Sequence, residues 1–314
     1  MFNLPYVPTA DGLIDKSFRK GSKVAKAKRS TRKLKEIRLR KSEEARVEAV
    51  AKTIQSDLKA LIKHFPSYEQ LPVFYQRLLD IRIDKDHYKK SLGAVQWCLK
   101  NIQQLRTETL RDIRRSKDTA PAKEFLGRSA SMVKRISGDL DNLIEIKQTL
   151  RGFPTVEEVP TLVIAGYANV GKSTFVHNLT GSKVKIASYP FTTQRILIGH
   201  KRRRYQRYQI IDSPGLLDRS MKERNKIELQ AILAMKELAD VILFLIDPTL
   251  DIESQLSLLK EVEEISPRFF VAINKIDIAD EGVIEALEGR LKNPLKISAR
   301  NPGDCERVFK EIFG

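Results

Sequence analysis

Cysteine, tryptophan and long apolar runs are scarce in this sequence of 314 residues, which has two cysteines and one tryptophan. Cys98 and Cys305 belong to no CxxC pattern and have no histidine at metal-ligand spacing, which excludes a disulfide framework and a cysteine zinc site and favours reduced thiols. The longest apolar run, 241–246, is far too short to span a bilayer. Residues 1–12 lack the charged start and apolar block of a signal peptide. We therefore expect a cytoplasmic protein without a transmembrane segment.

Acidic residues are also scarce, but only in the first half of the chain. Through Phe153 there are 34 Lys and Arg against 18 Asp and Glu, and from Pro154 onward there are 23 against 22. The first half therefore carries +16 of the net charge of +17. A basic half beside a nearly neutral half indicates that the first half contacts a polyanion. The length suffices for two domains, which we predict at residues 1–153 and 154–314.

The basic residues are densest between residues 16 and 41, where 13 of them accompany one acid, Glu36. Residues 1–15 have two prolines and no periodic pattern, which predicts an extended arm. We expect 16–41 to be mobile or only partly helical until an anion neutralises its charge. Neutralising phosphates would release counterions and make binding dependent on salt. A solvated charge run without a specific partner and an acidic membrane surface are the alternatives, although few apolar residues are available to anchor a membrane.

Apolar residues then recur at three- and four-residue steps and predict four helices that pack as a bundle. The fourth is predicted as one helix carrying Leu126 to Leu150. The third carries Trp97, for which the apolar helix favours a core position or a domain contact over base stacking. The helices are predicted to end near Pro66, Ile83, Pro121 and Gly152.

The stretch from Gly166 to Ser173 fits the pattern G-x-x-x-x-G-K-[ST] between an apolar run at 161–165 and a helical pattern. Such a loop turns backbone N–H groups inward at a helix N-terminus and so binds polyphosphate. Lys172 would reach the β- and γ-phosphates, and the Ser173 hydroxyl would bind Mg²⁺. A chance match is the alternative, which the motifs downstream disfavour. The loop groups predicted to bind phosphate belong to Asn169, Val170, Gly171, Lys172, Ser173 and Thr174.

Strand and helix patterns alternate after this loop, which predicts a doubly wound α/β domain with a mostly parallel sheet. Residues 183–193 are predicted to be irregular. Two strands follow, joined by the basic tip 201–206, which fits RNA phosphates or ordinary solvent exposure equally well. The second strand ends in the D-x-x-G sequence 212–215. The Asp212 carboxylate can hold the Mg²⁺ shell, and the Gly215 N–H can approach the γ-phosphate closely.

Two further stretches of the sequence are predicted to select the base of the bound nucleotide. A strand at 269–273 runs into the N-K-x-D sequence that begins at Asn274 and ends at Asp277. The Asp277 carboxylate can accept the N1–H and the exocyclic amine of guanine, a donor pair that adenine lacks, and Asn274 can hold the loop and reach the other edge of the purine. Backbone N–H groups of 298–300 can bind the guanine carbonyl oxygen. We therefore expect GTP and GDP to be bound also by Asn274, Lys275, Asp277, Ser298, Ala299 and Arg300.

These four motifs, together with the threonine pair Thr192-Thr193 between the first two, make the second half resemble the P-loop GTPases, which have five motifs in this order. More narrowly, the stretches 167–173, 189–193 and 212–217 resemble the Obg-related branch. With the basic helical half in front and the lead-in 153–156, the whole chain is similar to the nucleolar GTP-binding protein 1 family, and its end just after the GTPase motifs resembles a short archaeal member. The resemblance implies a role in large ribosomal subunit assembly, with residues 16–41 and the helical bundle contacting ribosomal RNA or a precursor particle.

The resemblance also implies the remaining site residues. It favours Thr193 over Thr192 as the ligand of Mg²⁺ and the γ-phosphate. With Lys172 and Gly215, Thr193 completes the predicted catalytic set. The predicted metal ligands are Ser173, Thr193 and Asp212.

Hydrolysis requires a positioned water, and the position that often carries a water-orienting glutamine is Leu216 here. We expect slow intrinsic turnover, raised by a GTPase-activating partner or by a monovalent cation. Asn169 matches the position used by potassium-activated relatives, which implies K⁺ at the phosphates, and bracing of the loop is the alternative role. The alternative function for the chain is a non-enzymatic RNA-binding assembly factor in which nucleotide is mainly structural.

Overall fold

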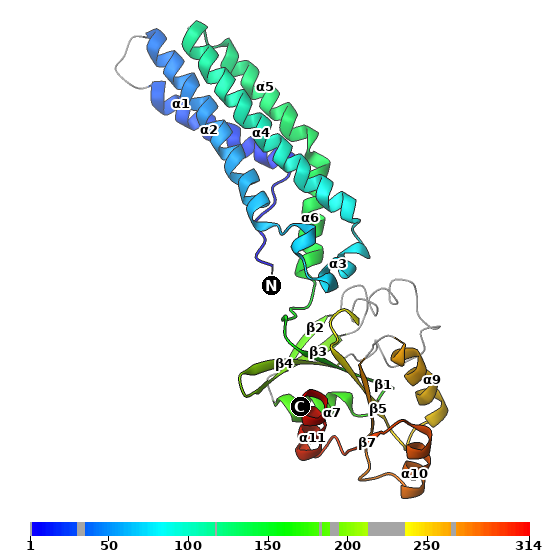
Figure 1. Cartoon of the computed structure of the whole chain (residues 1–314). Helices are drawn as coiled ribbons and strands as arrows, with labels where there is room; N and C mark the ends of the chain where they lie inside the picture. The colour runs from blue at the N-terminus through cyan, green and yellow to red at the C-terminus, as the bar shows by residue number, and fades with distance from the viewer. Residues whose placement is uncertain are drawn as a thin grey trace. The chain divides into compact units, whose positions relative to one another are not determined.

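The computed structural model describes residues 2–29, 35–116, 118–181, 184–188, 195–212, 236–264 and 268–314 (Figure 1). The chain divides into two compact units. One comprises Met1–Leu71 with Arg82–Arg151, and the other comprises Pro72–Ile81 with Gly152–Gly314. In the part of the chain that the structure describes, no helix is both long enough and apolar enough to cross a membrane.

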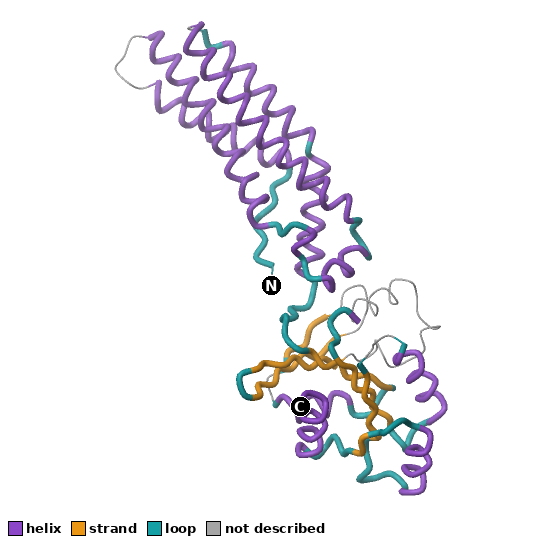
Figure 2. The backbone as a smooth tube through the Cα atoms, viewed as in Figure 1, coloured by secondary structure: helices purple, strands orange, loops and turns teal. Residues whose placement is uncertain are grey.

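The first unit is the predicted helical bundle. Helix α1 packs on α2, α2 on α4, and α4 on both α5 and α6, and Figure 2 shows the long helices running side by side. The periodic apolar residues predicted to face the core, from Val47 to Leu61, are fully buried. Its elements are α1 (Ala10–Arg29), α2 (Lys35–His64), η1 (Tyr68–Gln70), α4 (Lys85–Ser116), α5 (Ala120–Arg135) and α6 (Ser137–Arg151).

The basic segment is more helical than predicted. The extended arm ends at Thr9 instead of continuing to residue 15, so that part of the expectation was wrong. Within 16–41 the described residues belong to α1 and α2, which contradicts a partial helix for them, whereas the mobility expected without an anion stays a prediction. Every fourth residue of α1 is buried, and most of these residues are small: Leu13, Ser17, Gly21 and Ala25. A Cβ at Gly21 would lie 2.5 Å from Val50 Cγ2, so the small residues allow α1 to approach α2 closely. This packing stabilises a helix that its charge alone would oppose.

The predicted fourth helix is in fact two helices, α5 and α6. They separate at Ile136, where φ is −99° and ψ is 15°. Ser137 and Gly138 follow, and glycine in particular has low helix propensity. The prediction missed this break because the buried apolar residues continue on both sides of it.

Trp97 is not a core residue. It is 38% exposed, and the Arg135 guanidinium lies 4.9 Å from the centroid of its ring. The stacked cation accounts for the position of the ring at the surface of the bundle. The core position is therefore wrong, and the domain contact stays a prediction.

The second unit is built on a sheet with the strand order β2-β3-β4-β1-β5-β6-β7. Strands β4, β1, β5, β6 and β7 are parallel, and β2, β3 and β4 pair in antiparallel fashion. Strand β2 lies in a stretch predicted to be irregular. The predicted, mostly parallel α/β sheet is confirmed. The strands are β1 (Thr161–Gly166), β2 (Lys185–Ser188), β3 (Arg195–Arg203), β4 (Gln206–Asp212), β5 (Val241–Ile246), β6 (Phe269–Ile273) and β7 (Leu295–Lys296).

Helices cover both faces of this sheet. Apolar residues of α7 (Lys172–Thr180) and α11 (Pro302–Phe313) form a core with alternate residues of β1 and β5. Helix α9 (Ile252–Glu263) contacts β1 and β5 from the other face, and α10 (Glu281–Arg290) follows β6 along the chain (Figure 1). Because both faces are covered, β1 and β5 are buried along their whole length.

One helix from the first half of the sequence belongs to the second unit. Helix α3 (Val73–Asp80) packs on the stretch that leads into β1. The Tyr75 hydroxyl donates to Pro154 O at 2.9 Å and accepts from Val156 N at 3.0 Å, and its ring stacks on Phe153. Burial raises the pKa of Tyr75 and keeps the phenol neutral. The stretch 152–156 is therefore held by α3.

Candidate functional site: the phosphate loop and the base loops

The phosphate loop lies between β1 and α7, as predicted, and its two glycines are required by space and by backbone conformation. Gly166 has φ +138°, and a Cβ there would lie 2.4 Å from Leu245 O. Gly171 has φ +99°, and a Cβ there would lie 2.4 Å from Asn274 Nδ2. Both values of φ are unfavourable for residues with a side chain. The loop therefore passes close to the end of β5 and to the start of the N-K-x-D sequence.

The two polar side chains that end the loop have defined partners. Lys172 is 6% exposed, and its Nζ donates to Gly166 O at 2.8 Å and to Tyr167 O at 2.6 Å. The Ser173 hydroxyl donates to Asp212 Oδ2 at 2.5 Å. Asp212 is fully buried at the end of β4, where Ile164 of β1 is its register partner. Hydroxyl and carboxylate oxygens are ligands that Mg²⁺ prefers, so this pair fits the predicted metal site.

Asn274 joins the phosphate loop to the second base loop. Its Nδ2 donates to Val170 O at 2.7 Å, and its Oδ1 accepts from Ala299 N at 2.7 Å. The side chain is 1% exposed. Asn274 therefore holds the loop, as predicted, and both polar atoms of its amide are used in doing so. The amide also has a second N–H and a second oxygen lone pair, so it could reach the far edge of the purine without giving up either bond.

The phosphate loop and the base loops line one hollow of about 160 Å³. Asp277 is exposed there, so its carboxylate can meet a base. Two of the backbone N–H groups predicted for the guanine oxygen have partners within the protein, since Ser298 N donates to Asp304 and Ala299 N to Asn274. A guanine oxygen at Ala299 would therefore share this donor with Asn274. The hollow is lined by Asn169, Gly171, Thr174, Asn274, Lys275, Asp277, Ile278, Ser298, Ala299 and Arg300.

Two supporting residues were missed by the analysis of the sequence. Asp247 is fully buried at the end of β5, and its Oδ2 lies 2.5 Å from Lys275 Nζ. Lys275 has φ +61°, an uncommon conformation that this ion pair accompanies. Asn178 of α7 donates to Ala299 O at 2.7 Å. A carboxylate directly after a buried strand next to the N-K-x-D strand was the available signal for Asp247, whereas Asn178 had none.

Several predicted residues cannot be placed. Thr192, Thr193, Gly215 and Leu216 lie outside the residues that the structure describes. Their roles at the γ-phosphate, at Mg²⁺ and in hydrolysis stay predictions.

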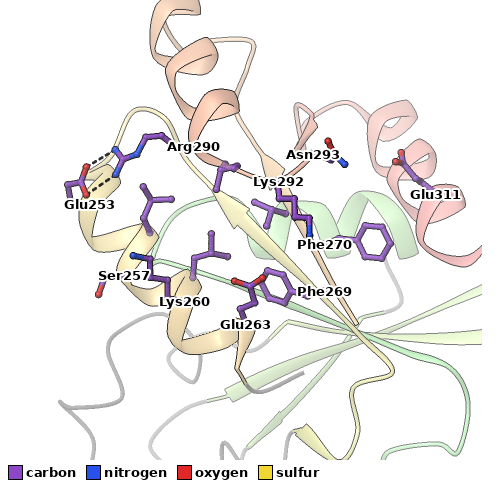
Figure 3. A pocket seen from close by; sticks show the side chains of 14 residues that line it. Glu253, Ser257, Lys260, Glu263, Phe269, Phe270, Arg290, Lys292, Asn293 and Glu311 are labelled. Atoms are coloured by element: carbon purple, nitrogen blue, oxygen red, sulfur yellow. Dashed lines mark hydrogen bonds and ion pairs between the residues drawn. The ribbon is translucent and has the colours of Figure 1, made fainter. Parts of the chain in front are cut away.

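A second hollow is larger than the one at the phosphate loop. It has a volume of about 1210 Å³ and lies between α9, β6 and the residues after α10 (Figure 3). Glu253 and Arg290 close one end with two hydrogen bonds of 2.7 and 3.0 Å. None of its lining residues belongs to the predicted nucleotide motifs, so its size alone does not make it the nucleotide site.

Comparison with known proteins agrees with this arrangement over both halves of the chain. A family model described as the NOG1 N-terminal helical domain matches residues 2–157, and one described as 50S ribosome-binding GTPase matches residues 161–275. An uncharacterised protein of Methanocaldococcus jannaschii is 40% identical over 287 residues, which cover 88% of this chain and 81% of that protein. The nucleolar GTP-binding protein 1 of Caenorhabditis elegans is 33% identical over 247 residues, which cover 74% of this chain.

The chain belongs to the nucleolar GTP-binding protein 1 family. It spans about 36% of the length of the C. elegans and Drosophila melanogaster members, so the NOG1 proteins it matches there are much longer. A solved Plasmodium falciparum structure assigned to nucleolar GTP-binding protein 1 is 29% identical, with a TM-score of 0.43, and covers 51% of this chain and 88% of that one. The resemblance stated from the motifs is confirmed.

Proposed function

We propose that this protein is a GTP-binding and GTP-hydrolysing switch that acts in assembly of the large ribosomal subunit. The observation that carries the proposal is the single hollow lined by the phosphate loop and both base loops, with Asn274 tying the loops together. The names of the relatives support the nucleotide and the ribosomal setting. The basic helical unit would contact ribosomal RNA or a precursor particle.

The site residues divide the work of binding between the two ends of the nucleotide. Loop N–H groups at the start of α7 and the Lys172 ammonium bind the phosphates. Asp277 accepts from the guanine edge and so distinguishes GTP from ATP. Mg²⁺, held by Ser173 with Asp212 beside it and by the predicted ligand Thr193, would neutralise charge on the phosphate oxygens.

Hydrolysis needs a group that this chain does not supply in the usual place, since Leu216 cannot orient water. A GTPase-activating partner or K⁺ would supply it. Asn169 supports the second option, because it is exposed, lies in the left-handed conformation at φ +66° and lines the nucleotide hollow. Turnover faster in KCl than in NaCl at equal ionic strength would support K⁺, whereas equal rates would contradict it.

The helical unit supplies the charge for a polyanion. Helix α1 is basic and buries only its small-residue face against α2. Five of its lysines are exposed: Lys16, which pairs with Asp57, and Lys20, Lys23, Lys26 and Lys28. Contacts between such side chains and phosphates would make binding strongly dependent on salt.

The test compares nucleotide states on the natural target. The intact chain is mixed with large-subunit particles, and its affinity is measured with GDP and with a non-hydrolysable GTP analogue, together with single-turnover hydrolysis of GTP. A switch requires the two affinities to differ and GTP to be cleaved. Equal affinities without cleavage would contradict the switch and favour an RNA-binding assembly factor in which nucleotide is structural.

A further inference from the structure

The hairpin formed by β3 and β4 ends in a tip, residues 201–207, that has no acidic residue. We call it the basic hairpin tip. Tyr205 lies in its two-residue turn and is 98% exposed. Arg204, the other turn residue, has φ +52°, which brings the two strands into a tight reversal. The tip holds five cations around this ring: Lys201, Arg202, Arg203, Arg204 and Arg207.

One face of the hairpin is anchored on α11. Side chains alternate between the faces, so Lys201 and its register partner Tyr208 point the same way. Lys201 forms an ion pair with Glu306 of α11. The Tyr208 ring lies 5.1 Å from the Phe309 ring and 4.7 Å from the Phe313 ring, centroid to centroid. The base of the hairpin is thereby fixed while its tip extends beyond the sheet.

The tip lines a shallow hollow of about 390 Å³ that is open to solvent. On the face opposite α11, Arg202 and Arg207 are register partners. Glu157 lies beside this face, 3.0 Å from Arg207 and 3.3 Å from His200. The hollow is lined by His200, Lys201, Arg202, Tyr205 and Arg207.

We propose that the basic hairpin tip binds single-stranded RNA, with one base stacked on Tyr205 and backbone phosphates on Arg202, Arg203 and Arg204. Among the described residues, these three arginines take part in no ion pair, so their guanidinium groups are available for phosphate. A fully exposed ring beside them is the combination that holds unstacked bases. Duplex bases are not accessible to a side chain in this way, and a single tyrosine is too little apolar surface for a membrane anchor.

This surface is separate from both sites of the proposed function. It shares no residue with the nucleotide hollow or with residues 16–41. It would place a second RNA contact on the unit that binds nucleotide. The inference therefore goes beyond the proposed function, and either can fail while the other stands.

The test uses the intact chain and an unstructured RNA of about 12 nucleotides, within the usual site size of such proteins. The variant R202Q/R203Q/R204Q is compared with K260Q/K292Q/K310Q, which removes the same charge from exposed positions of the same unit. The tip variant should bind at least about tenfold more weakly, and its salt slope should be shallower by about 2, since each phosphate contact on a single strand contributes about 0.7. The control should change neither quantity. Equal losses in the two variants would overturn the proposal.

Substitutions of Tyr205 test base stacking separately from the charge of the arginines. Y205A should weaken RNA binding by about tenfold with an unchanged salt slope, and Y205F should bind as the wild type does, because a phenyl ring also stacks. Photocrosslinked RNA should map to Tyr205. Crosslinks confined to residues 16–41, or tip variants that lose anionic vesicles but retain RNA, would overturn the proposal. GTP affinity, measured in the same preparations, should be unchanged and confirms that each variant is folded.

Discussion

Replacing Asn274 with alanine is expected to loosen two loops of the nucleotide site at once. The substitution removes two hydrogen bonds of 2.7 Å: the one that Asn274 Nδ2 donates to Val170 O and the one that Asn274 Oδ1 accepts from Ala299 N. Val170 is fully buried and Ala299 is 3% exposed, so water does not readily replace the lost amide. A buried polar group left without a partner costs about 1–3 kcal/mol, and two such groups predict a loss of about 2–6 kcal/mol of unfolding free energy in the second unit.

The assay must report on the second unit alone, because a chain of two units need not unfold in a single step. Trp97, the only tryptophan, lies in the first unit, so its fluorescence does not follow the relevant transition. Amide hydrogen exchange in β1 and β5 follows the unfolding of the second unit. These strands are fully buried and should show the strongest protection in the unit. Affinities for GTP and GDP, measured by calorimetry, give the second readout.

Asn301 offers a matched control. It caps α11, and its side chain accepts from Gly303 N at 2.9 Å. Its contact with the loop at 298–300 is made by the backbone, where Asn301 N donates to Ser298 O at 2.8 Å, and alanine keeps that bond. Asn301→Ala should cost about 1 kcal/mol, as other helix caps do, and leave nucleotide affinity unchanged. Asn274→Ala should lower protection in β1 and β5 and the affinity for both GTP and GDP. Weaker GTP binding with unchanged protection would refute the reasoning, because Asn274 would then act only as a base ligand.

Three further perturbations follow from the structure. Gly171→Ala should abolish nucleotide binding in calorimetry, since its Cβ would lie 2.4 Å from Asn274 Nδ2 at φ +99°, whereas normal affinity would contradict the loop geometry. Burial, only partly offset by Glu157, lowers the pKa of His200, so its contribution to stability is present above about pH 6.5 and lost as the pH falls. The melting temperature of the wild-type protein should therefore fall between pH 8 and pH 5 more than that of His200→Gln. Identical dependence on pH in the two proteins would exclude the effect. Burial raises the pKa of both cysteine thiols to about 12, so iodoacetamide should label them only after unfolding, and rapid labelling of the native protein would show that one is accessible.

The nucleotide half was largely predictable because its signals are local. Each buried parallel strand is a short apolar run, and each motif directly follows such a strand or begins a helix. Parallel strands bring those motifs to one edge of the sheet, so the hollow between the loops follows from the order of the elements. The bond from Asn274 to Val170 joins residues 104 positions apart, and only the folded chain shows that both amide atoms are used.

The helical half was less predictable, since its packing depends on distant partners. In α1 the buried residues are serine, glycine and alanine as well as leucine, which a search for large apolar residues passes over. The number of its cations suggested disorder, because charge repulsion is visible in the sequence and close packing on α2 is not. Helix α3 likewise has no local feature that assigns it to the second unit. Its place follows from the bonds of Tyr75 to residues 154 and 156.

Titration of the purified intact chain with GTP and with ATP in the presence of Mg²⁺ tests the central claim most directly. In our proposal the exposed Asp277 carboxylate would accept two hydrogen bonds from guanine. Each bond to a charged acceptor contributes about 1.5–3 kcal/mol, so GTP should bind at least about a hundredfold more tightly than ATP. Asp277→Asn should remove that preference without unfolding the protein. Equal affinities of the wild-type protein for GTP and ATP, or a preference that survives Asp277→Asn, would contradict the account.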